Sequence, residues 1–353
     1  MLAADDVVIG QSLPLGGAAF STASRIVAGA DAALRRINAT GGIAGRPLRI
    51  VTLDDEGDPR RHAANVRRLL AQEGAVALVN CVGDLSCIES AAVATDRRVP
   101  LIGPLSGAAA LQTGGSGYVV PVRPPYSREA SALTSQLRAM GITSVAVLSD
   151  GSDGAERSGV FAEAAKRLGL QVTTISTGSS DAALEAAFAG IARANVQAVL
   201  LDVGDATVSA MARRTPPSAQ HWPRTLLRFS SPGVTMLARL FPDRLVAYTM
   251  VVPNAESSTL PLARELQADA DGGPGPAALT FEGTEAYLNV RLAALALRRA
   301  APVRSGHAAF PGAIEGLGPL AIGGFPLVPG RPGKSASDWV DVGYRQRHGL
   351  LLR

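Results

Sequence analysis

The segment over residues 28–70 places a helix, a glycine-rich turn, a short strand, an acidic loop and a second helix in direct succession. Its first helix carries apolar residues at the three-to-four spacing of one buried face, as at Ile26, Ala33 and Ile37. Asn38, followed within four residues by two glycines, predicts the end of that helix. A helix that stops so sharply before a strand is typical of an α/β unit.

The strand and the second helix have equally clear signals. Residues 48–53 form a short apolar run, and Asp54 and Asp55 follow it directly. Asp58, with Pro59 after it, predicts the N-cap and first turn of the next helix. Short strands between helices of this length favour a parallel sheet with right-handed crossovers.

The same alternation continues through most of the chain. We expect strands over residues 118–122, 145–148, 171–175, 198–201, 225–229 and 246–252. We expect helices over residues 127–140, 156–168, 182–194, 206–213, 234–241, 261–271 and 281–300. The C-terminal stretch alternates as strands and a turn would, so the predicted fold class is α/β throughout.

Composition sets the broad class. With 353 residues, 47% of them hydrophobic and 18% charged, the chain suits two globular domains. No apolar run approaches the roughly 20 residues that span a bilayer. The start, MLAADD, lacks the charged and apolar regions of a secretion signal, and we interpret it as a mature or recloned N-terminus with Ala3 and Ala4 near a cleavage site.

A formal charge of +4 does not indicate nucleic acid as a partner, because the basic residues are spread along the chain. The densest cluster lies on the predicted second helix, around its apolar stripe, and a solvated helix face is the favoured interpretation. It consists of Arg60, Arg61, Arg67 and Arg68. The aromatic interleaving of single-strand binders does not accompany it.

Several motifs resemble those of the periplasmic solute-binding proteins of branched-chain amino acid type ABC importers. In that family a first strand leads into a P-L-x-G loop, and the next helix ends I-N-x-x-G-G-I-x-G-R before a strand and D-D. The corresponding residues here are Pro14, Leu15, Gly17, Ile37, Asn38, Gly41, Gly42, Ile43, Gly45, Arg46, Asp54 and Asp55. Further matches are VPLIGPLSGA at 99–108, RPPYSRE at 123–129, VVP at 251–253 and FEG at 281–283, so the resemblance covers nearly the whole chain.

The resemblance implies a type I periplasmic binding fold, with two Rossmann-like lobes joined by a three-segment hinge. Residues 1–122 and 254–327 would form the N-terminal lobe, and residues 123–253 and 328–353 the C-terminal lobe. The implied protein is a periplasmic monomer, the substrate-binding component of an ABC transporter. It captures an amino acid or related carboxylate by hinge closure and is recognised by the membrane permease. A periplasmic ligand sensor for a signalling system is the alternative.

The two cysteines, Cys81 and Cys87, flank a short loop. Their spacing excludes C-x-x-C redox and zinc motifs, and no second Cys or His pair completes a metal site. Two free thiols are one interpretation and a small disulfide is the other. Because an exported protein meets an oxidising compartment, we predict the disulfide.

Candidate ligand contacts in the first lobe lie in loops after strands, where helix N-termini present unpaired N–H groups. Ser86, with Leu85 beside it, matches the family's G-x-x-S/T loop, whose hydroxyl and amides receive a ligand carboxylate; a simple N-cap is the alternative for Ser86. Ser106 and Gly107 correspond to the segment that binds the ammonium and carboxylate of an amino acid. Leu15 is expected to line the same cleft.

The second lobe departs from the family pattern. Asp153 stands where relatives commonly place an aromatic residue, Gly204 stands near another such position, and the loop after Phe229 lacks the acid often found there. Asp150, Asp153, Asp202 and Asp205 gather at strand ends instead. One or two of them could bind a cationic ligand group, and ordinary N-cap and turn aspartates are the favoured alternative.

Two aromatic residues are further candidates, and motifs for catalysis are missing. Tyr126 and Phe281 are candidate hinge-side walls of the site, with core packing favoured for Phe281. The histidines are scattered without H-E-x-x-H spacing, and neither a G-x-S-x-G elbow nor a dinucleotide fingerprint is present. We therefore expect a binding protein rather than an enzyme, without a cofactor or a catalytic metal.

Overall fold

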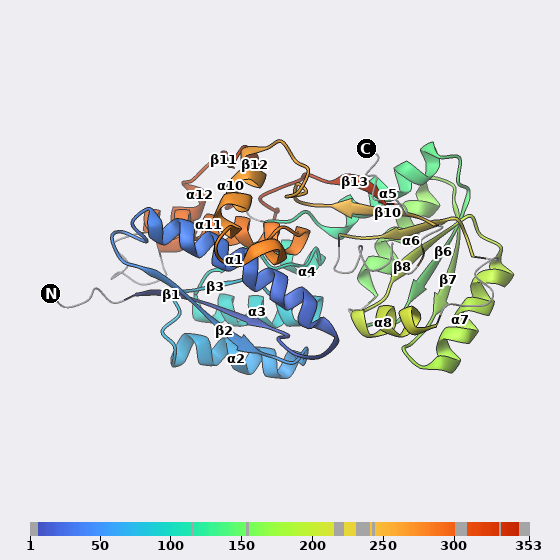
Figure 1. Cartoon of the computed structure of the whole chain (residues 1–353), viewed down its shortest axis with the longest axis horizontal. Helices are drawn as coiled ribbons and strands as arrows, with labels where there is room; N and C mark the ends of the chain where they lie inside the picture. The colour runs from blue at the N-terminus through green and yellow to red at the C-terminus, as the bar shows by residue number, and fades with distance from the viewer. Residues whose placement is uncertain are drawn as a thin grey trace. The chain divides into compact units, whose positions relative to one another are not determined.

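The computed structural model describes residues 6–113, 116–152, 155–214, 222–230, 241, 244–300, 309–331 and 333–345. The chain divides into two compact units, one of residues 1–125 and 252–339 and the other of residues 126–251 and 340–353. Each is an α/β unit built on a mainly parallel sheet (Figure 1). This agrees with the predicted fold class.

Unit 1 contains a sheet with the strand order β2-β1-β3-β4-β5, and every pair in it is parallel. Its strands are β1 (Val7–Leu13), β2 (Leu48–Asp54), β3 (Ala77–Val79), β4 (Leu101–Ile102) and β5 (Val119–Val120). The helices between and after them are η1 (Gly17–Ala19), α1 (Phe20–Ala39), α2 (Pro59–Ala71), α3 (Asp84–Arg97), α4 (Ala109–Gln112), α10 (Pro261–Ala270), η3 (Gly275–Ala278), α11 (Phe281–Ala300) and α12 (Phe310–Glu315). A separate hairpin pairs β11 (Leu320–Ile322) with β12 (Phe325–Leu327).

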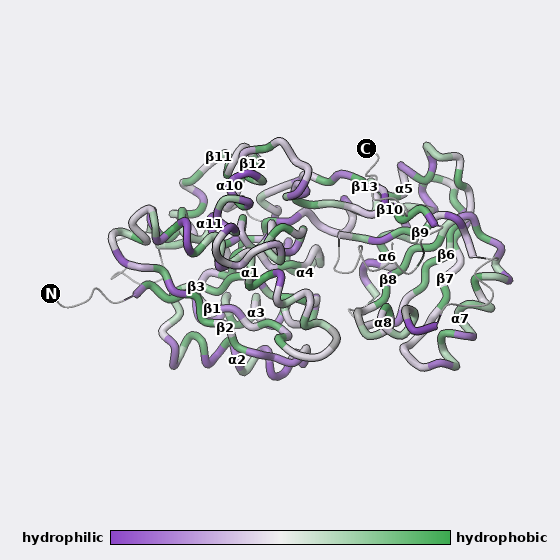
Figure 2. Tube along the Cα trace, viewed as in Figure 1, coloured by the Kyte–Doolittle hydropathy of each residue, from purple (hydrophilic) through white to green (hydrophobic). Residues whose placement is uncertain are grey.

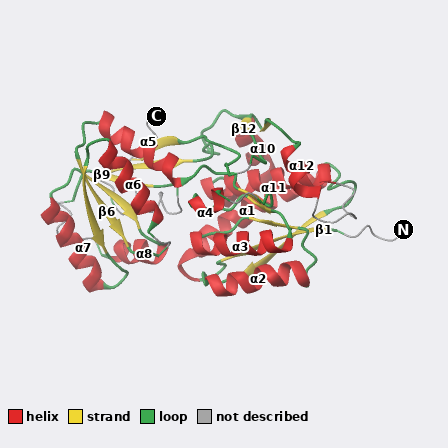
Figure 3. Cartoon of the chain, turned by 180° about the vertical axis from the view of Figure 1, so that it is seen from behind, coloured by secondary structure: helices red, strands yellow, loops and turns green. Residues whose placement is uncertain are grey.

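Alternating side chains of these strands form two cores, one on each face of the sheet. Val8 and Leu78 pack with α2 and α3 on one face, while Ile9 and Val79 pack with α1 and α11 on the other. The period of two along a strand sends neighbouring residues to opposite faces. Seen from behind, α2 and α3 cover the near side of the sheet (Figure 3), and the strands are among the most hydrophobic segments of the trace (Figure 2).

Unit 2 contains a second sheet with the order β13-β10-β9-β8-β6-β7, parallel except where β13 pairs antiparallel with β10. Its strands are β6 (Ser144–Ser149), β7 (Gln171–Ser176), β8 (Ala198–Asp202), β9 (Thr225–Arg228), β10 (Leu245–Met250) and β13 (Asp341–Arg345). Its described helices are α5 (Tyr126–Ala139), α6 (Glu156–Arg167), α7 (Asp181–Ala194) and α8 (Asp205–Arg213). The helix expected over residues 234–241 falls almost entirely outside the described residues.

The unit boundaries differ from the expected ones at all three crossings, most at the last. Residues 328–339, assigned to the C-terminal lobe from the sequence, lie in unit 1. The backbone explains this, because the amides of Ala336 and Ser337 donate to the carbonyl oxygens of Pro121 and Val122, the residues directly after β5. Arg123 also stays in unit 1, where its Nε lies 3.2 Å from Glu285 Oε1 on α11.

A chain of buried amides fastens α11 to the sheet of unit 1. Asn289 Nδ2 donates to Asn80 Oδ1 at 3.0 Å and to the carbonyl oxygen of Gly103 at 2.9 Å. Asn80 Nδ2 in turn donates to Gln11 Oε1 at 3.0 Å. A Cβ atom on Gly103 would lie 2.0 Å from Asn289 Cγ, so the glycine leaves the space that the asparagine fills. These contacts place the carboxyl ends of β1, β3 and β4 relative to α11.

Replacing Asn289 by alanine is expected to destabilise unit 1 by about 2–4 kcal/mol, because it opens a cavity and deprives Asn80 and Gly103 of a buried donor. Chemical denaturation followed by circular dichroism measures the loss. Gln72→Ala, at the exposed C-cap of α2, is the control and should change stability by less than about 0.5 kcal/mol. Equal stability of the two variants would contradict this account of the amide chain.

Candidate ligand-binding site

In each unit the strand order reverses at one place, and ligands of open α/β sheets bind outside the carboxyl ends of the strands at such a point. In unit 1 the reversal lies between β1 and β3, so the loops after these two strands define the candidate site. In unit 2 it lies between β6 and β8. Most of the residues predicted as ligand contacts belong to these loops or to the loop after β4.

The loop after β3 ends at Gly83, which is the N-cap of α3 and has a left-handed φ of 85° that favours glycine. Asp84 is therefore the first residue of the helix, Leu85 the second and Ser86 the third. The alternative interpretation of Ser86 as the N-cap is wrong, because Gly83 occupies that position. Ser86 is 6% exposed and has no side-chain hydrogen bond among those described.

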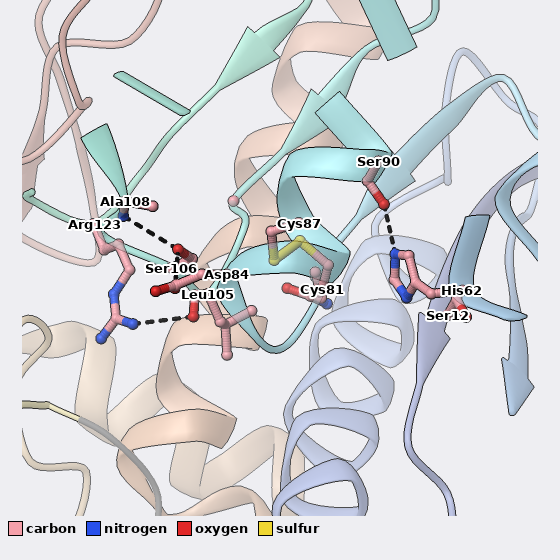
Figure 4. The surroundings of a disulfide bond; sticks show 12 residues. Ser12, His62, Cys81, Asp84, Cys87, Ser90, Leu105, Ser106, Ala108 and Arg123 are labelled. Atoms are coloured by element: carbon pink, nitrogen blue, oxygen red, sulfur yellow. Dashed lines mark hydrogen bonds between the residues drawn. A yellow bond between two sulfur atoms is a disulfide. The ribbon is translucent and has the colours of Figure 1, made fainter. Parts of the chain in front are cut away.

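Asp84, which sequence reasoning did not single out, dominates this loop. Its Oδ1 accepts a hydrogen bond from Ser106 Oγ at 2.6 Å, and Ser106 Oγ also accepts one from the amide of Ala108 at 3.2 Å (Figure 4). Asp84 and Ser106 are both buried. The hydroxyl expected to reach a ligand therefore joins the loop after β4 to the first turn of α3. An acid at the first position of a predicted helix, directly after a strand and a glycine, is the signal that could have found it.

A buried ion pair supports the same loop from the other side. Arg123 Nη1 donates to the carbonyl oxygen of Leu105 at 3.1 Å (Figure 4). Arg123 Nε lies 3.2 Å from Glu285 Oε1. Both charged side chains are about 5% exposed. Gly107, the next predicted contact, is buried in this loop as well. The backbone at residues 105–107 is thus fixed by groups of unit 1 itself.

The predicted disulfide is confirmed: Cys81 and Cys87 are bonded, with their Cα atoms 5.4 Å apart. Cys81 precedes Gly83 and Cys87 lies in the first turns of α3, so the bond spans the loop that carries Asp84 (Figure 4). The amide of Leu105 donates to the carbonyl oxygen of Cys81 at 3.1 Å. The disulfide therefore fixes the β3–α3 loop, and the loop after β4 is attached to it.

The loop after β1 is held by the acid pair that ends β2. The amide of Leu15 donates to Asp54 Oδ1 at 2.9 Å, and the Leu15 side chain is half-buried against the core of unit 1. Phe281, at the first residue of α11, also packs against that core. Among the large apolar residues that the structure describes, Phe20 and Leu85 have the highest exposed fraction, 56% each. They lie at the N-termini of α1 and α3.

Asp55, His62 and Ser90 form a serine–histidine–aspartate arrangement next to this site. His62 Nδ1 lies 2.8 Å from Asp55 Oδ2, and His62 Nε2 lies 2.6 Å from Ser90 Oγ (Figure 4). The distances match those of a hydrolytic triad. All three residues are only 1–2% exposed, however, and Ser90 lies inside α3 rather than on a strand-to-helix turn. The arrangement joins β2, α2 and α3 and does not offer substrate a nucleophile.

In unit 2 the carboxylate of Asp202 is held by protein groups. Arg157 Nε lies 2.8 Å from Asp202 Oδ1, and Ser158 Oγ donates to Asp202 Oδ2 at 2.5 Å. The same guanidinium lies over the ring of Tyr126, 5.6 Å from its centroid, and that ring meets Phe229 edge to face at 5.8 Å. Tyr126 is thus part of a buried aromatic cluster. Asp202 already has an intramolecular cation.

Asp150 joins the two loops at the reversal of strand order in unit 2. Its Oδ2 accepts from the amide of Gly204, the N-cap of α8, at 2.9 Å, and its Oδ1 accepts from the amide of Ser152 at 3.0 Å. Burial acts to raise the pKa of Asp150, but hydrogen bonds from Thr207, Ser152 and Gly204 outweigh it and hold the pKa below its usual value. This is the turn-forming role that the sequence favoured for these aspartates.

Two of the acids predicted at these strand ends cannot be placed further. Asp153 lies outside the described residues, and of Asp205 only the backbone, at the first residue of α8, is described. Within the described ranges, no group of three or more His, Cys, Asp or Glu side chains could hold a metal ion. No helix in those ranges is both long and apolar enough to cross a membrane.

The fold agrees with that of similar proteins. The family model for periplasmic binding proteins matches residues 6–325. An amino acid binding protein of Pseudomonas aeruginosa is 35% identical over 99 residues, which span 28% of this chain and 26% of that protein. A substrate-binding periplasmic protein of Ralstonia solanacearum is 25% identical, with a TM-score of 0.86 over 98% of this chain and 99% of the other.

A third structure, a possible leucine/isoleucine/valine-binding protein of Rhodopirellula baltica, is 24% identical, with a TM-score of 0.86 over 100% of this chain and 98% of the other. The fold is thus that of the type I periplasmic binding proteins. The chain belongs to the periplasmic binding protein family. This family consists of binding proteins rather than enzymes.

Replacing Ser90 by alanine is expected to lower the free energy of unfolding by about 1–3 kcal/mol, because the buried His62 Nε2 loses its partner. Denaturant titration measures this, with Glu89→Ala on the exposed face of α3 as the control. A fluorophosphonate probe should leave the native wild-type protein unlabelled. Labelling at Ser90 would contradict the structural role given to these three residues.

The lowered pKa of Asp150 predicts a stability term that is fully present above the unfolded value of about 3.9 and is lost as pH falls through the folded pKa. Asp150→Asn should therefore weaken the protein at neutral pH and flatten the fall in unfolding free energy below about pH 4. Thr207→Val removes one lowering hydrogen bond and should shift the fall to higher pH. Denaturant titrations over a pH series measure both, and slopes identical to wild type would contradict the assignment.

Proposed function

We propose that this protein is the extracytoplasmic substrate-binding component of an ABC importer and captures a small polar ligand, an amino acid or a related compound, for a membrane permease. The single observation that carries the proposal is the loop cluster at the strand reversal of unit 1. There Asp84, Ser86 and Ser106 gather at the start of α3, in a chain that the family model matches over residues 6–325. The closure of the lobes around the ligand, implied by the resemblance, belongs to this proposal.

Two features support binding at this edge. The loops are held in place by the disulfide and by the Arg123–Glu285 pair, so few backbone dihedrals need ordering when a ligand arrives. Ser86, with no side-chain hydrogen bond among those described, has a hydroxyl to offer a ligand. The disulfide also suits an oxidising compartment outside the cytoplasm.

Capture of a ligand predicts a concentration-dependent rise in the midpoint of thermal unfolding, because a ligand that binds only the folded state stabilises it by mass action. The test uses refolded, ligand-stripped protein and a panel built on shared skeletons, with each skeleton present as acid, amide, amine and amino acid. Ser86→Ala should lower the affinity for the bound compound by about tenfold or more, because it removes one hydrogen bond to a charged group. Glu89→Ala, three residues after Ser86 and on the exposed face of α3, should leave the affinity unchanged.

Two results would contradict the proposed function. If no compound of the panel shifts the thermal midpoint of the wild-type protein, ligand capture is not its function. If the protein converts a bound compound into a product, the protein is an enzyme rather than a transport binding protein. Transport itself is tested by deleting the gene for the permease encoded nearest to this chain and measuring uptake of the bound compound.

A further inference from the structure

We infer that unit 1 contains a second binding site, a cavity that takes a small inorganic oxyanion of the phosphate or sulfate class. The cavity lies between the end of α4, strand β5 and the turn at residues 330–334, all of them parts of unit 1. None of its described lining residues is a candidate ligand contact. The inference therefore goes beyond the proposed function and does not depend on it.

The size and the lining of the cavity suit part of a compact anion. Its volume of about 20 Å³ holds one or two water-sized groups. One or two oxygen atoms of a tetrahedral anion are of that size, and the others then remain where the cavity opens to solvent. Among the described residues that line the cavity, Arg331 and Lys334 are basic and none is acidic. The lining thus favours an anion over a cation.

Gln112 supplies a hydrogen-bond donor that lacks an acceptor. The residue is 8% exposed, and its Nε2 atom is buried without a hydrogen-bond partner in the described structure. An unpaired buried donor costs free energy, which an entering acceptor recovers. A half-turn of the side-chain amide exchanges Nε2 with Oε1, so the donor can be presented to the cavity that Gln112 lines. An oxyanion offers acceptors only, as this donor requires.

The turn at residues 330–334 brings a positive charge to this amide. Gly333 has a left-handed φ of 68° and lies so close to α4 that an added Cβ atom would be 3.3 Å from the carbonyl oxygen of Gln112. Lys334 follows directly, is exposed, and makes no ion pair with the other described residues. A lysine ammonium is a compact charge with three donors, which suits phosphate.

Arg331 is the second cation, and protein groups hold it in place. Its Nε donates to the carbonyl oxygen of Val328 at 3.3 Å, and its Nη2 donates to that of Ser335 at 3.2 Å. Nη2 also lies 3.9 Å from Asp338 Oδ2, so part of this charge is balanced within unit 1. Arg331 therefore shapes the turn, while Lys334 supplies the charge that an anion meets.

The test uses the fact that the chain has two lysines, Lys334 and Lys166. Lys166 is exposed in the last turn of α6, in unit 2, and is an internal reference. Wild-type protein is acetylated with a limiting amount of N-hydroxysuccinimide acetate, and peptide mass spectrometry gives the ratio of labelling at Lys334 to that at Lys166. Millimolar phosphate or sulfate should lower this ratio by about threefold or more, because a bound anion shields one lysine in proportion to its occupancy. Sodium chloride of equal ionic strength should leave the ratio unchanged.

Gln112→Leu separates the cavity from general surface attraction. Leucine has a similar size and no donor, so the phosphate concentration needed for protection should rise by about tenfold or more. The variant should fold, because the amide has no hydrogen bond to lose. Gln72→Leu makes the same change at the exposed C-cap of α2 in the same unit, and protection of Lys334 should be unchanged there.

The results that would overturn the inference are distinct. An unchanged labelling ratio in phosphate and in sulfate means that the cavity takes water only. An equal effect of chloride means that salt screening is the cause. Full protection in Gln112→Leu means that the anion is held outside the cavity. Should Gln112→Leu fail to fold, the heat of phosphate binding decides: it should disappear in Lys334→Gln and remain in Lys166→Gln, and its persistence in Lys334→Gln overturns the site. All of these results leave the proposed function standing.

Discussion

The position of β1 between β2 and β3 is the constraint on which the rest of unit 1 depends. The strand order reverses between β1 and β3, and the connections that leave these two strands run to opposite faces of the sheet, with α1 on one face and α3 on the other. Their loops therefore separate at the carboxyl edge and leave polar backbone there without a strand to pair with. The buried side chains of Asp55 and Asn289 and the exposed side chain of Asp54 occupy this edge and fix where each loop can lie.

Acids hold the loops at the carboxyl edges of both sheets. In unit 2 Asp202 is held by Arg157 and Ser158, and Asp150 is held by backbone amides. In unit 1 Asp84 accepts a hydrogen bond from the Ser106 hydroxyl, which joins the loop after β4 to the start of α3.

Local signals in the sequence predicted a large part of this fold. Asp58 caps α2 through the amide of Arg60, as its position before Pro59 predicted, and the apolar period placed α1 and α11. The short helices α4 and α12 were not predicted, because they are too short for a period to appear. The last crossing was misplaced because the pairing of residues 336–337 with residues 121–122 is a contact between segments far apart in the chain. For the same reason the sequence did not predict the hydrogen bond from Ser106 to Asp84, because the two residues are distant in the sequence and meet only in the fold.

The disulfide between Cys81 and Cys87 bears on the kinetics of binding. It closes during folding, so the loop that carries Asp84 loses its conformational entropy before a ligand is present. A rigid loop presents the same geometry at every encounter, which removes a search among loop conformers from the association step. Differences in affinity among related ligands should then appear in how long each one stays bound, while their association rates remain similar.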